Sequence, residues 1–218
     1  MKRPVLTLIA ILGLFALACG LLDEEAATIE YEEGIPVDFE IDADEICPPD
    51  IELDVDCEDD PQESPERIEL EPIEFSIDID IVDATGNDDL RNVTDRLRSL
   101  EITSIDYKVT DNDLSFDLPD VDIFVAPLGT EEADDEDAIL LTTIPSVPES
   151  ENVEPAERAN VEEANRAEAS ELFKAMEYAA IPKAQPVVEE GQDFPPHGTA
   201  EIELTINIKI TANPTDDL

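Results

Sequence analysis

The side chains best suited to chemistry in this sequence are carboxylates gathered at predicted turns. Asp111 and Asp113 flank an asparagine, and Asp117 and Asp120 follow shortly after them. Oxygen atoms of this kind suit calcium, which takes about six to eight of them. None of these segments matches the spacing of an EF-hand calcium loop. The four aspartates are therefore candidate ligands for calcium or another divalent cation, and the alternative is that they are solvated turn acids.

Two cysteines form a second candidate pair. Cys47 and Cys57 enclose a short segment that begins with two prolines and is rich in acids. In an oxidising compartment such a pair forms a disulfide. The spacing is not Cys-x-x-Cys and no histidine lies nearby, which argues against metal binding or redox catalysis. The sequence predicts a structural Cys47–Cys57 disulfide.

No arrangement of residues points to catalysis. His197 is the only histidine and lies in a proline-rich loop, so a zinc site built on several histidines is excluded. The Gly-x-Ser-x-Gly and His-Glu-x-x-His motifs are both absent. A glycosidase would need only two carboxylates, but tryptophan is absent and aromatic residues make up 5% of the chain. We expect a protein that is not an enzyme and has no catalytic residues.

The N-terminal segment has the form of a secretory signal. Positive residues at positions 2–3 precede an apolar run from Val5 to Ala18. That run is shorter than the roughly 20 residues of a membrane-spanning helix, and it fits the apolar region of a signal peptide. We therefore exclude residues 1–18 from the folded domain.

The end of this run resembles the lipobox of bacterial lipoproteins. The sequence reads Ala16-Leu17-Ala18-Cys19-Gly20, although that family most often has leucine where Ala16 stands. The resemblance implies cleavage before Cys19 and acylation of that cysteine, and two or more acyl chains hold a protein firmly on a membrane. Gly20 in place of aspartate implies the outer membrane. An ordinary signal peptide cut after Ala18 is the alternative.

The net charge of the chain limits the kinds of partner that it can bind. Asp and Glu number 58 against 12 Lys and Arg, for a formal net charge of -46. Such a chain cannot neutralise phosphates, so nucleic acid is excluded as a partner, as is docking on anionic lipid through a basic surface. Self-repulsion on this scale favours an environment of high salt. The charge is thus typical of halophilic adaptation, or else it gathers divalent cations.

Alternation of apolar and polar residues is the main structural pattern. It has a period of two, which predicts antiparallel strands with one buried face. Helical spacing appears in two places only, at residues 88–100 and 155–179. The predicted strands cover residues 35–41, 51–55, 73–81, 102–109, 114–118, 121–126, 138–144 and 202–210. The prediction is an all-β fold, an antiparallel β-sandwich or open barrel with two accessory helices, spanning residues 29–214 after an acidic tether at 19–28.

Two stretches of the domain are similar to late-embryogenesis-abundant type 2 proteins. They are residues 112–125 and residues 206–214, the second of which ends in Asn213-Pro214. The resemblance implies an immunoglobulin-like sandwich and carries no catalytic residue to this chain.

Together these patterns predict a lipid-anchored, non-enzymatic protein of the cell envelope with a structural or interaction role. Its partners would be the membrane, through the lipid, and a protein that the sequence does not identify. The alternatives are a module that binds calcium or another divalent cation, without any other cofactor, and a carrier of an apolar ligand.

Overall fold

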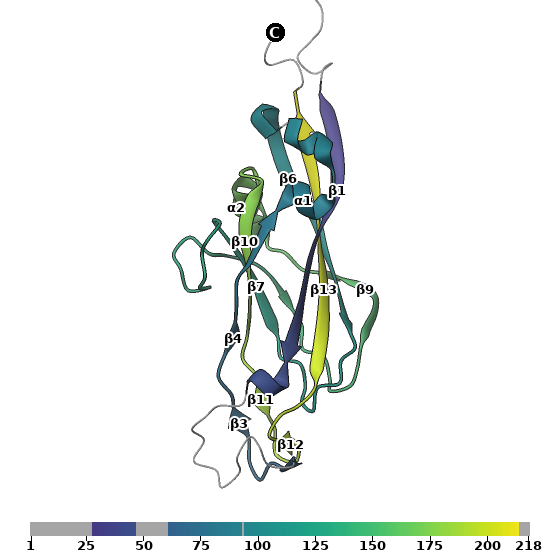
Figure 1. The fold of residues 1–218 in the computed structure, drawn as a ribbon, viewed down its shortest axis with the longest axis vertical. Coiled ribbons are helices and arrows are strands. Elements are labelled where there is room, and N and C mark those ends of the chain that lie inside the picture. Colours follow the sequence, from purple (N-terminus) through teal and green to yellow (C-terminus); the bar gives the residue numbers. More distant parts are fainter. Residues whose placement is uncertain (1–27, 47–60, 93, 214–218) are drawn as a thin grey trace, which may run out of the picture.

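The computed structural model describes residues 28–46, 61–92 and 94–213. The molecule is elongated and consists mainly of two antiparallel sheets (Figure 1). The predicted all-β fold with two accessory helices is confirmed.

The first sheet has four strands in the order β1-β13-β6-β9. Three of them are 14 residues long: β1 (Ile29–Asp42), β6 (Leu97–Thr110) and β13 (Thr199–Ala212). At about 3.4 Å per residue each spans on the order of 45 Å, and β1 and β13 run along the molecule side by side (Figure 1). Their register begins at Ile29–Ala212 and ends at Asp42–Thr199. The start of β1 and the end of β13 therefore lie at the same pole.

The second sheet is built around β10 (Glu177–Ala184). One edge of β10 pairs with β7 (Val121–Ala126), which pairs in turn with β8 (Ile139–Ile144). The other edge pairs with two short strands, β4 (Ile73–Glu74) and β5 (Ile77–Asp80). Two further ladders join β2 (Gln62–Glu63) to β12 (Asp193–Phe194) and β3 (Ile68–Glu69) to β11 (Val187–Val188).

A largely aliphatic core joins the two sheets. The alternating residues of β1 and β13 point inward, so that Ile35 and Ile206 are fully buried. A few aromatic side chains supplement them, and Phe173 stacks on Tyr178 with ring centroids 4.1 Å apart. Burial of the apolar face of each strand is the main stabilising contribution to such a fold.

The predicted helix at residues 88–100 is wrong. The chain forms two short 3-10 turns, η3 (Asp88–Asn92) and η4 (Thr94–Arg96), and strand β6 begins at Leu97. The helix of this region, α1 (Ile81–Thr85), lies earlier, where the Asp80 carboxylate accepts hydrogen bonds from the first helical N–H groups. Pairing with β13 outweighs the local helical spacing, because it gives hydrogen-bond partners to the main-chain groups along one edge of β6.

The second predicted helix, at residues 155–179, is shorter in the structure. Helix α2 spans Glu163–Phe173, between β9 (Val153–Ala159) and β10. It ends just before Met176, which has a φ of 63° and turns the chain into β10. The strand predicted at 114–118 is also not regular, since only Leu118 forms an isolated bridge, with Val147. The strand predicted at 51–55 lies outside the described residues.

Candidate functional site

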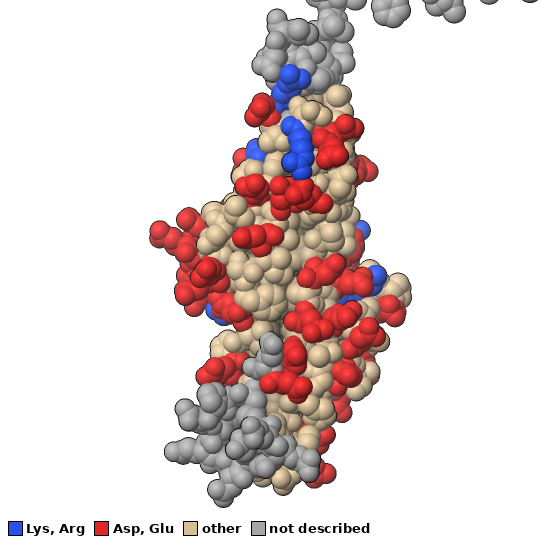
Figure 2. Space-filling view, viewed as in Figure 1, with Lys and Arg blue, Asp and Glu red and all other residues tan. Residues whose placement is uncertain are grey.

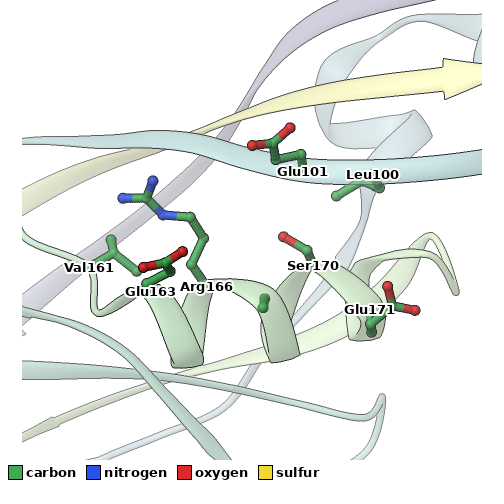
Figure 3. Close-up of a pocket in the computed structure, with 8 residues that line it drawn as sticks. Leu100, Glu101, Val161, Glu163, Arg166, Ser170 and Glu171 are labelled. Atoms are coloured by element: carbon green, nitrogen blue, oxygen red, sulfur yellow. The ribbon is translucent and has the colours of Figure 1, made fainter.

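A pocket among the described residues lies between α2 and β6. Strand β9 pairs with β6 only from Ile105 to Val109, so α2 packs against the earlier part of β6. The pocket has a volume of about 440 Å³ and is shown in Figure 3. Its wall combines apolar side chains with charged ones, from Leu100, Glu101, Val161, Glu163, Arg166, Ala167, Ser170 and Glu171.

Helix α2 is fixed to both sheets. The Ser170 hydroxyl oxygen accepts a hydrogen bond of 3.1 Å from the N–H of Ile102 in β6. On the other side the Asn165 amide donates to the Leu140 carbonyl of β8 at 2.7 Å. The Phe173–Tyr178 stack attaches the end of the helix to β10. The helical wall of the pocket is therefore held in place before any ligand arrives.

Arg166 is the distinctive residue of this pocket. Its side chain extends from α2 toward β6 (Figure 3), and its Nε atom is buried without a hydrogen-bond partner. Within the described ranges, only Arg98 and Arg166 among the lysines and arginines form no ion pair or other charge contact. Arg98 is exposed, whereas Arg166 is half-buried. In so acidic a chain, an unpaired and partly buried arginine is an available binding group for an anion.

The remaining polar groups of the pocket differ in availability. Glu171 is neutralised by Lys174, whose Nζ lies 2.6 Å from its carboxylate. Glu163 forms no ion pair in the described part of the chain, whereas Glu101 lies opposite Lys209 of β13 and interacts with its charge. Ser170 is more than nine-tenths buried, and its hydroxyl hydrogen has no acceptor among the described residues. The pocket thus offers one unpaired cation, one unpaired carboxylate, that of Glu163, and one hydroxyl donor.

Three of the four aspartates predicted as metal ligands accept hydrogen bonds that hold loops together. Asp113 accepts hydrogen bonds from the N–H and hydroxyl of Thr199. Asp117 accepts a hydrogen bond from the Glu149 N–H at 3.0 Å, and Asp120 accepts one from the Ser146 N–H at 2.7 Å. Asp111 occupies a turn with a φ of 46°. Across the described ranges no three Asp, Glu, His or Cys side chains are grouped to hold a metal ion, so these four do not converge on one site.

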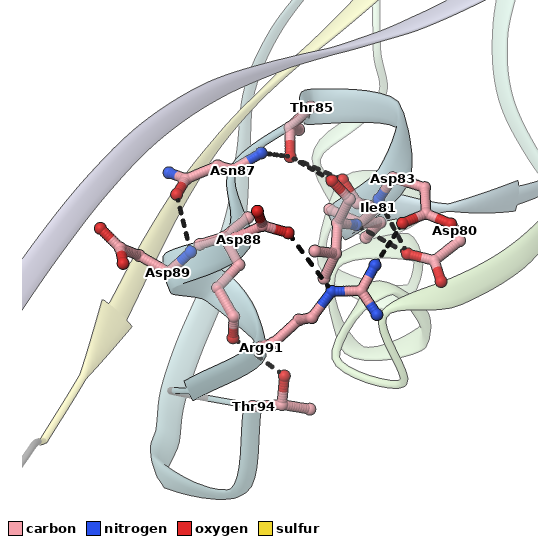
Figure 4. A network of polar contacts seen from close by, with 11 residues as sticks. Asp80, Ile81, Asp83, Thr85, Asn87, Asp88, Asp89, Arg91 and Thr94 are labelled. Carbon is pink, nitrogen blue, oxygen red and sulfur yellow. Dashed lines mark hydrogen bonds and ion pairs between the residues drawn. The ribbon is translucent and has the colours of Figure 1, made fainter.

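A further cluster of acids and amides, around α1 and η3, is also structural (Figure 4). Arg91 forms ion pairs with Asp83 and Asp88. Asn87 accepts a hydrogen bond from the Asp89 N–H at 3.1 Å and donates to Glu33 of β1 at 2.5 Å. These contacts close the turn and attach it to the first sheet.

Strand register places like charges opposite one another on the outer face of the first sheet. Asp38 faces Glu203, and Glu40 faces Glu201. Burial raises the pKa of Asp38, the neighbouring Glu203 raises it further, and Lys108 opposes them. Lys108 lies 2.7 Å from Glu203. Figure 2 shows acidic side chains spread over one face of the molecule rather than concentrated in one patch.

His197 does not belong to a catalytic triad among the described residues. Its backbone pairs with Ser115, because the Ser115 N–H donates to the His197 carbonyl at 2.9 Å. The Ser115 hydroxyl oxygen accepts from the backbone N–H of His197 at 3.0 Å. The imidazole Nδ1 is buried without a partner. The serine is thus held against main chain, without a hydrogen bond to the imidazole that could activate it.

Cys19, Cys47 and Cys57, the predicted lipidation and disulfide positions, lie outside the described residues. None of the helices in the described ranges is long and apolar enough to cross a membrane. The sequence did not single out Arg166 or Ser170, because a charged residue in an Ala- and Glu-rich helix looks like any solvated one. The chain matches no protein-family model, and searches of curated proteins and of solved structures found no significant match.

Proposed function

We propose that this protein is a lipid-anchored, non-enzymatic component of the outer membrane that binds a partner through the pocket between α2 and β6. The observation that carries the binding role is the unpaired, partly buried Arg166 in a pocket whose helical wall is fixed to both sheets. Charged side chains line this pocket and can recognise a partner of complementary charge.

The arrangement of the strands is compatible with an anchor on Cys19. Strand β1 begins at Ile29, at the pole where β13 ends. A tether of residues 19–28 reaches roughly 35 Å at full extension. The domain would then stand with this pole toward the bilayer and with β2, β3, β11 and β12 away from it.

The lining of the pockets favours a polar ligand over an apolar one. A second pocket of about 400 Å³ includes Asp120, Asp122 and Lys183. A third, of about 350 Å³, lies over the facing acids of β1 and β13. Each carries charged side chains, whereas a lipid carrier buries its ligand against mainly apolar walls.

Acylation of Cys19 tests the anchor directly. In a bacterial host, the wild-type chain should incorporate a labelled fatty acid and sediment with the outer membrane. Cys19→Ser should abolish both properties, because the acyl chains are its attachment. Cys57→Ser is the matched control, since it removes a thiol but retains Cys19, and it should remain labelled. A Cys19→Ser protein that stays equally membrane-bound would contradict the proposal.

A further inference from the structure

The pole where β1 begins and β13 ends is formed by the ends of three strands. Ile29 of β1 faces Ala212 of β13, which in turn faces the first residue of β6. The turn η4 lies at the same end, because the Arg96 carbonyl accepts a hydrogen bond of 3.1 Å from the N–H of Asn213. In the sequence Cys19 lies ten residues before Ile29. A chain anchored at Cys19 therefore has this pole nearest to the membrane.

Basic side chains gather at this pole, although the chain as a whole is strongly acidic. Three arginines lie within eight residues, at positions 91, 96 and 98, and Asp95 is the one acid between them. Residues 204–213, at the end of β13, contain one lysine and no acid. Figure 2 shows basic side chains close to this end of the molecule. These two segments thus carry more basic than acidic residues.

Arg98 is positioned to contact a group outside the domain. The register of β6 with β13 skips Arg98, which lies between Ser99 and Leu97. Arg98 is thus the extra residue of a β-bulge, a feature that redirects a side chain from the regular alternation of a strand. It is exposed, and it forms no ion pair within the described ranges.

The neighbouring side chains add an acid and an apolar group. Ile29 is 38% exposed and is one of two exposed large apolar residues in the described part of the chain. Asp95 is exposed, whereas Glu30 is neutralised by Lys209, whose Nζ lies 2.9 Å from its carboxylate. The strands extend on the order of 45 Å from this pole. Acids farther along them therefore lie outside the Debye length of about 10 Å at 0.1 M salt.

We infer that this pole docks on a zwitterionic phospholipid surface. Arg96 and Arg98 bind lipid phosphates, Asp95 lies beside a headgroup ammonium, and Ile29 contacts the boundary of the acyl chains. Arginine suits phosphate because its planar fork makes charge-assisted hydrogen bonds. An anionic bilayer fits less well, because it repels a chain of net charge -46 with an acidic tether. The inference goes beyond the lipid anchor and rests on the membrane location proposed with it.

The test attaches the chain to vesicles without using acylation. Residues 20–218 carry an N-terminal hexahistidine tag, and the vesicles contain a nickel-chelating lipid in phosphatidylethanolamine and phosphatidylcholine, with or without phosphatidylglycerol. The chain has no tryptophan, so a single introduced tryptophan reports energy transfer to a lipid with a dansyl headgroup. Ser99→Trp places this reporter at the pole, and Gln62→Trp places it on β2, toward the opposite end (Figure 1).

On vesicles without phosphatidylglycerol, we expect at least twofold more energy transfer from Ser99→Trp than from Gln62→Trp. Adding Arg96→Gln and Arg98→Gln together should at least halve the transfer from the pole, because both phosphate ligands are lost. The matched control is Arg67→Gln with Arg158→Gln, which removes the same charge from two exposed positions outside the pole and should leave the transfer unchanged. Phosphatidylglycerol should lower the transfer, because it repels the acidic chain.

Three results would overturn the inference: equal transfer from the two reporters, undiminished transfer in the Arg96 and Arg98 double variant with unchanged circular dichroism, or stronger transfer with phosphatidylglycerol. Each is independent of acylation, because the tag holds the chain on the vesicle. A failure of the Cys19 experiment would therefore leave this result readable. A pole that does not dock would likewise leave the labelling of Cys19 unchanged.

Discussion

At the scale of single residues, Gly198 joins the last loop to β13. It has a φ of 92°, and a Cβ atom there would overlap the carbonyl oxygen of Asp113. That carbonyl belongs to the segment that pairs with residues 197–199, where the Asp113 N–H donates to Thr199. The crossing of these two segments therefore requires glycine, both for its backbone conformation and for its lack of a side chain.

Gly198→Ala should lower the free energy of unfolding by about 2–4 kcal/mol, because it combines a strained φ with a backbone clash. Gly86→Ala is the control. Gly86 also has a positive φ, of 65°, but its surroundings are open, and the cost there should be about 1–2 kcal/mol. Urea unfolding of both variants measures the difference. Equal losses would show that the two segments do not approach as closely as described.

Tyr178 gives a prediction about alkaline pH. Its side chain is fully buried and its hydroxyl has no partner, and burial raises its pKa above the ordinary value near 10. A raised pKa in the folded state stabilises the protein below the unfolded pKa, and that contribution is lost as the pH rises through the folded pKa. Stability should therefore fall from about pH 10 upward.

Tyr178→Phe should reduce this alkaline fall, and at pH 7 it should leave stability nearly unchanged, because the hydroxyl has no hydrogen bond to lose. Tyr107→Phe provides a comparison, since that hydroxyl reaches Glu157 at 3.3 Å and its pKa is raised mainly by burial. It should lower stability at pH 7 by about 1 kcal/mol. Urea unfolding between pH 7 and 11 checks both variants, and a large loss in Tyr178→Phe at pH 7 would indicate a partner for the hydroxyl.

At the scale of the elements, the pairing of β1 with β13 brings acids together. Facing like charges destabilise a sheet, and the pKa of Asp38 is raised by burial first and by Glu203 second. Asp38→Asn should therefore raise the stability at pH 7 in low salt. The pKa of Asp38 in the folded state lies above its pKa in the unfolded state. The gain in stability should therefore disappear as the pH falls below the ordinary pKa of an aspartate, where the carboxyl is protonated in both states.

The measurement is thermal unfolding at 0.05 M and 1 M NaCl. The gain from Asp38→Asn should shrink in 1 M NaCl, since the Debye length there is about 3 Å. Asp89→Asn removes the same charge from an exposed turn. Asp89 is not part of a strand pair, so no acid lies opposite it as Glu203 lies opposite Asp38. A gain of the same size in Asp89→Asn would show that net charge, and not the facing pair, is responsible.

The elements also show what the sequence could predict. Alternation located β7 at its observed bounds and β8 within one residue, because both strands have one buried face. It could not locate α2 correctly, since the ends of that Ala- and Glu-rich stretch are taken by β9 and β10, which pair with distant strands. The spacing of Leu90, Leu97 and Leu100 suits a helix, yet Leu100 reaches the core from a strand.

The candidate site could not be predicted from the sequence, for a related reason. Whether Arg166 is paired depends on which acids the fold brings within reach, and the chain has 58 of them. The turn aspartates were predicted as ligands of a divalent cation because acids cluster there in the sequence. In the structure Asp113, Asp117 and Asp120 hold loops together through backbone N–H groups, a role that any acid-rich turn can fill.

At the scale of the whole molecule, the net charge of -46 should dominate the response to salt. Repulsion between acids destabilises the compact state, and screening relieves it. The urea midpoint should therefore rise steadily between 0.05 M and 1 M NaCl. Urea is preferable to guanidinium chloride here, because guanidinium is itself a salt.

Calcium chloride at matched ionic strength separates screening from specific binding. Since the four turn aspartates do not converge, we expect calcium to add no saturable stabilisation beyond that of NaCl. A saturable rise of the midpoint at micromolar calcium would instead indicate a specific cation site, as a ligand that binds only the folded state must stabilise it.

The shared pole of β1 and β13 has a mechanical consequence. If the chain is held before Ile29 and a force acts on the start of β13 at the opposite pole, the force loads the whole β1–β13 ladder in shear, from Ile29–Ala212 to Asp42–Thr199. A force that separates Ile29 from Ala212 would instead unzip the same ladder one pair at a time. The geometry makes the domain strong against a force along the two strands, and weak against a force that separates their ends at one pole.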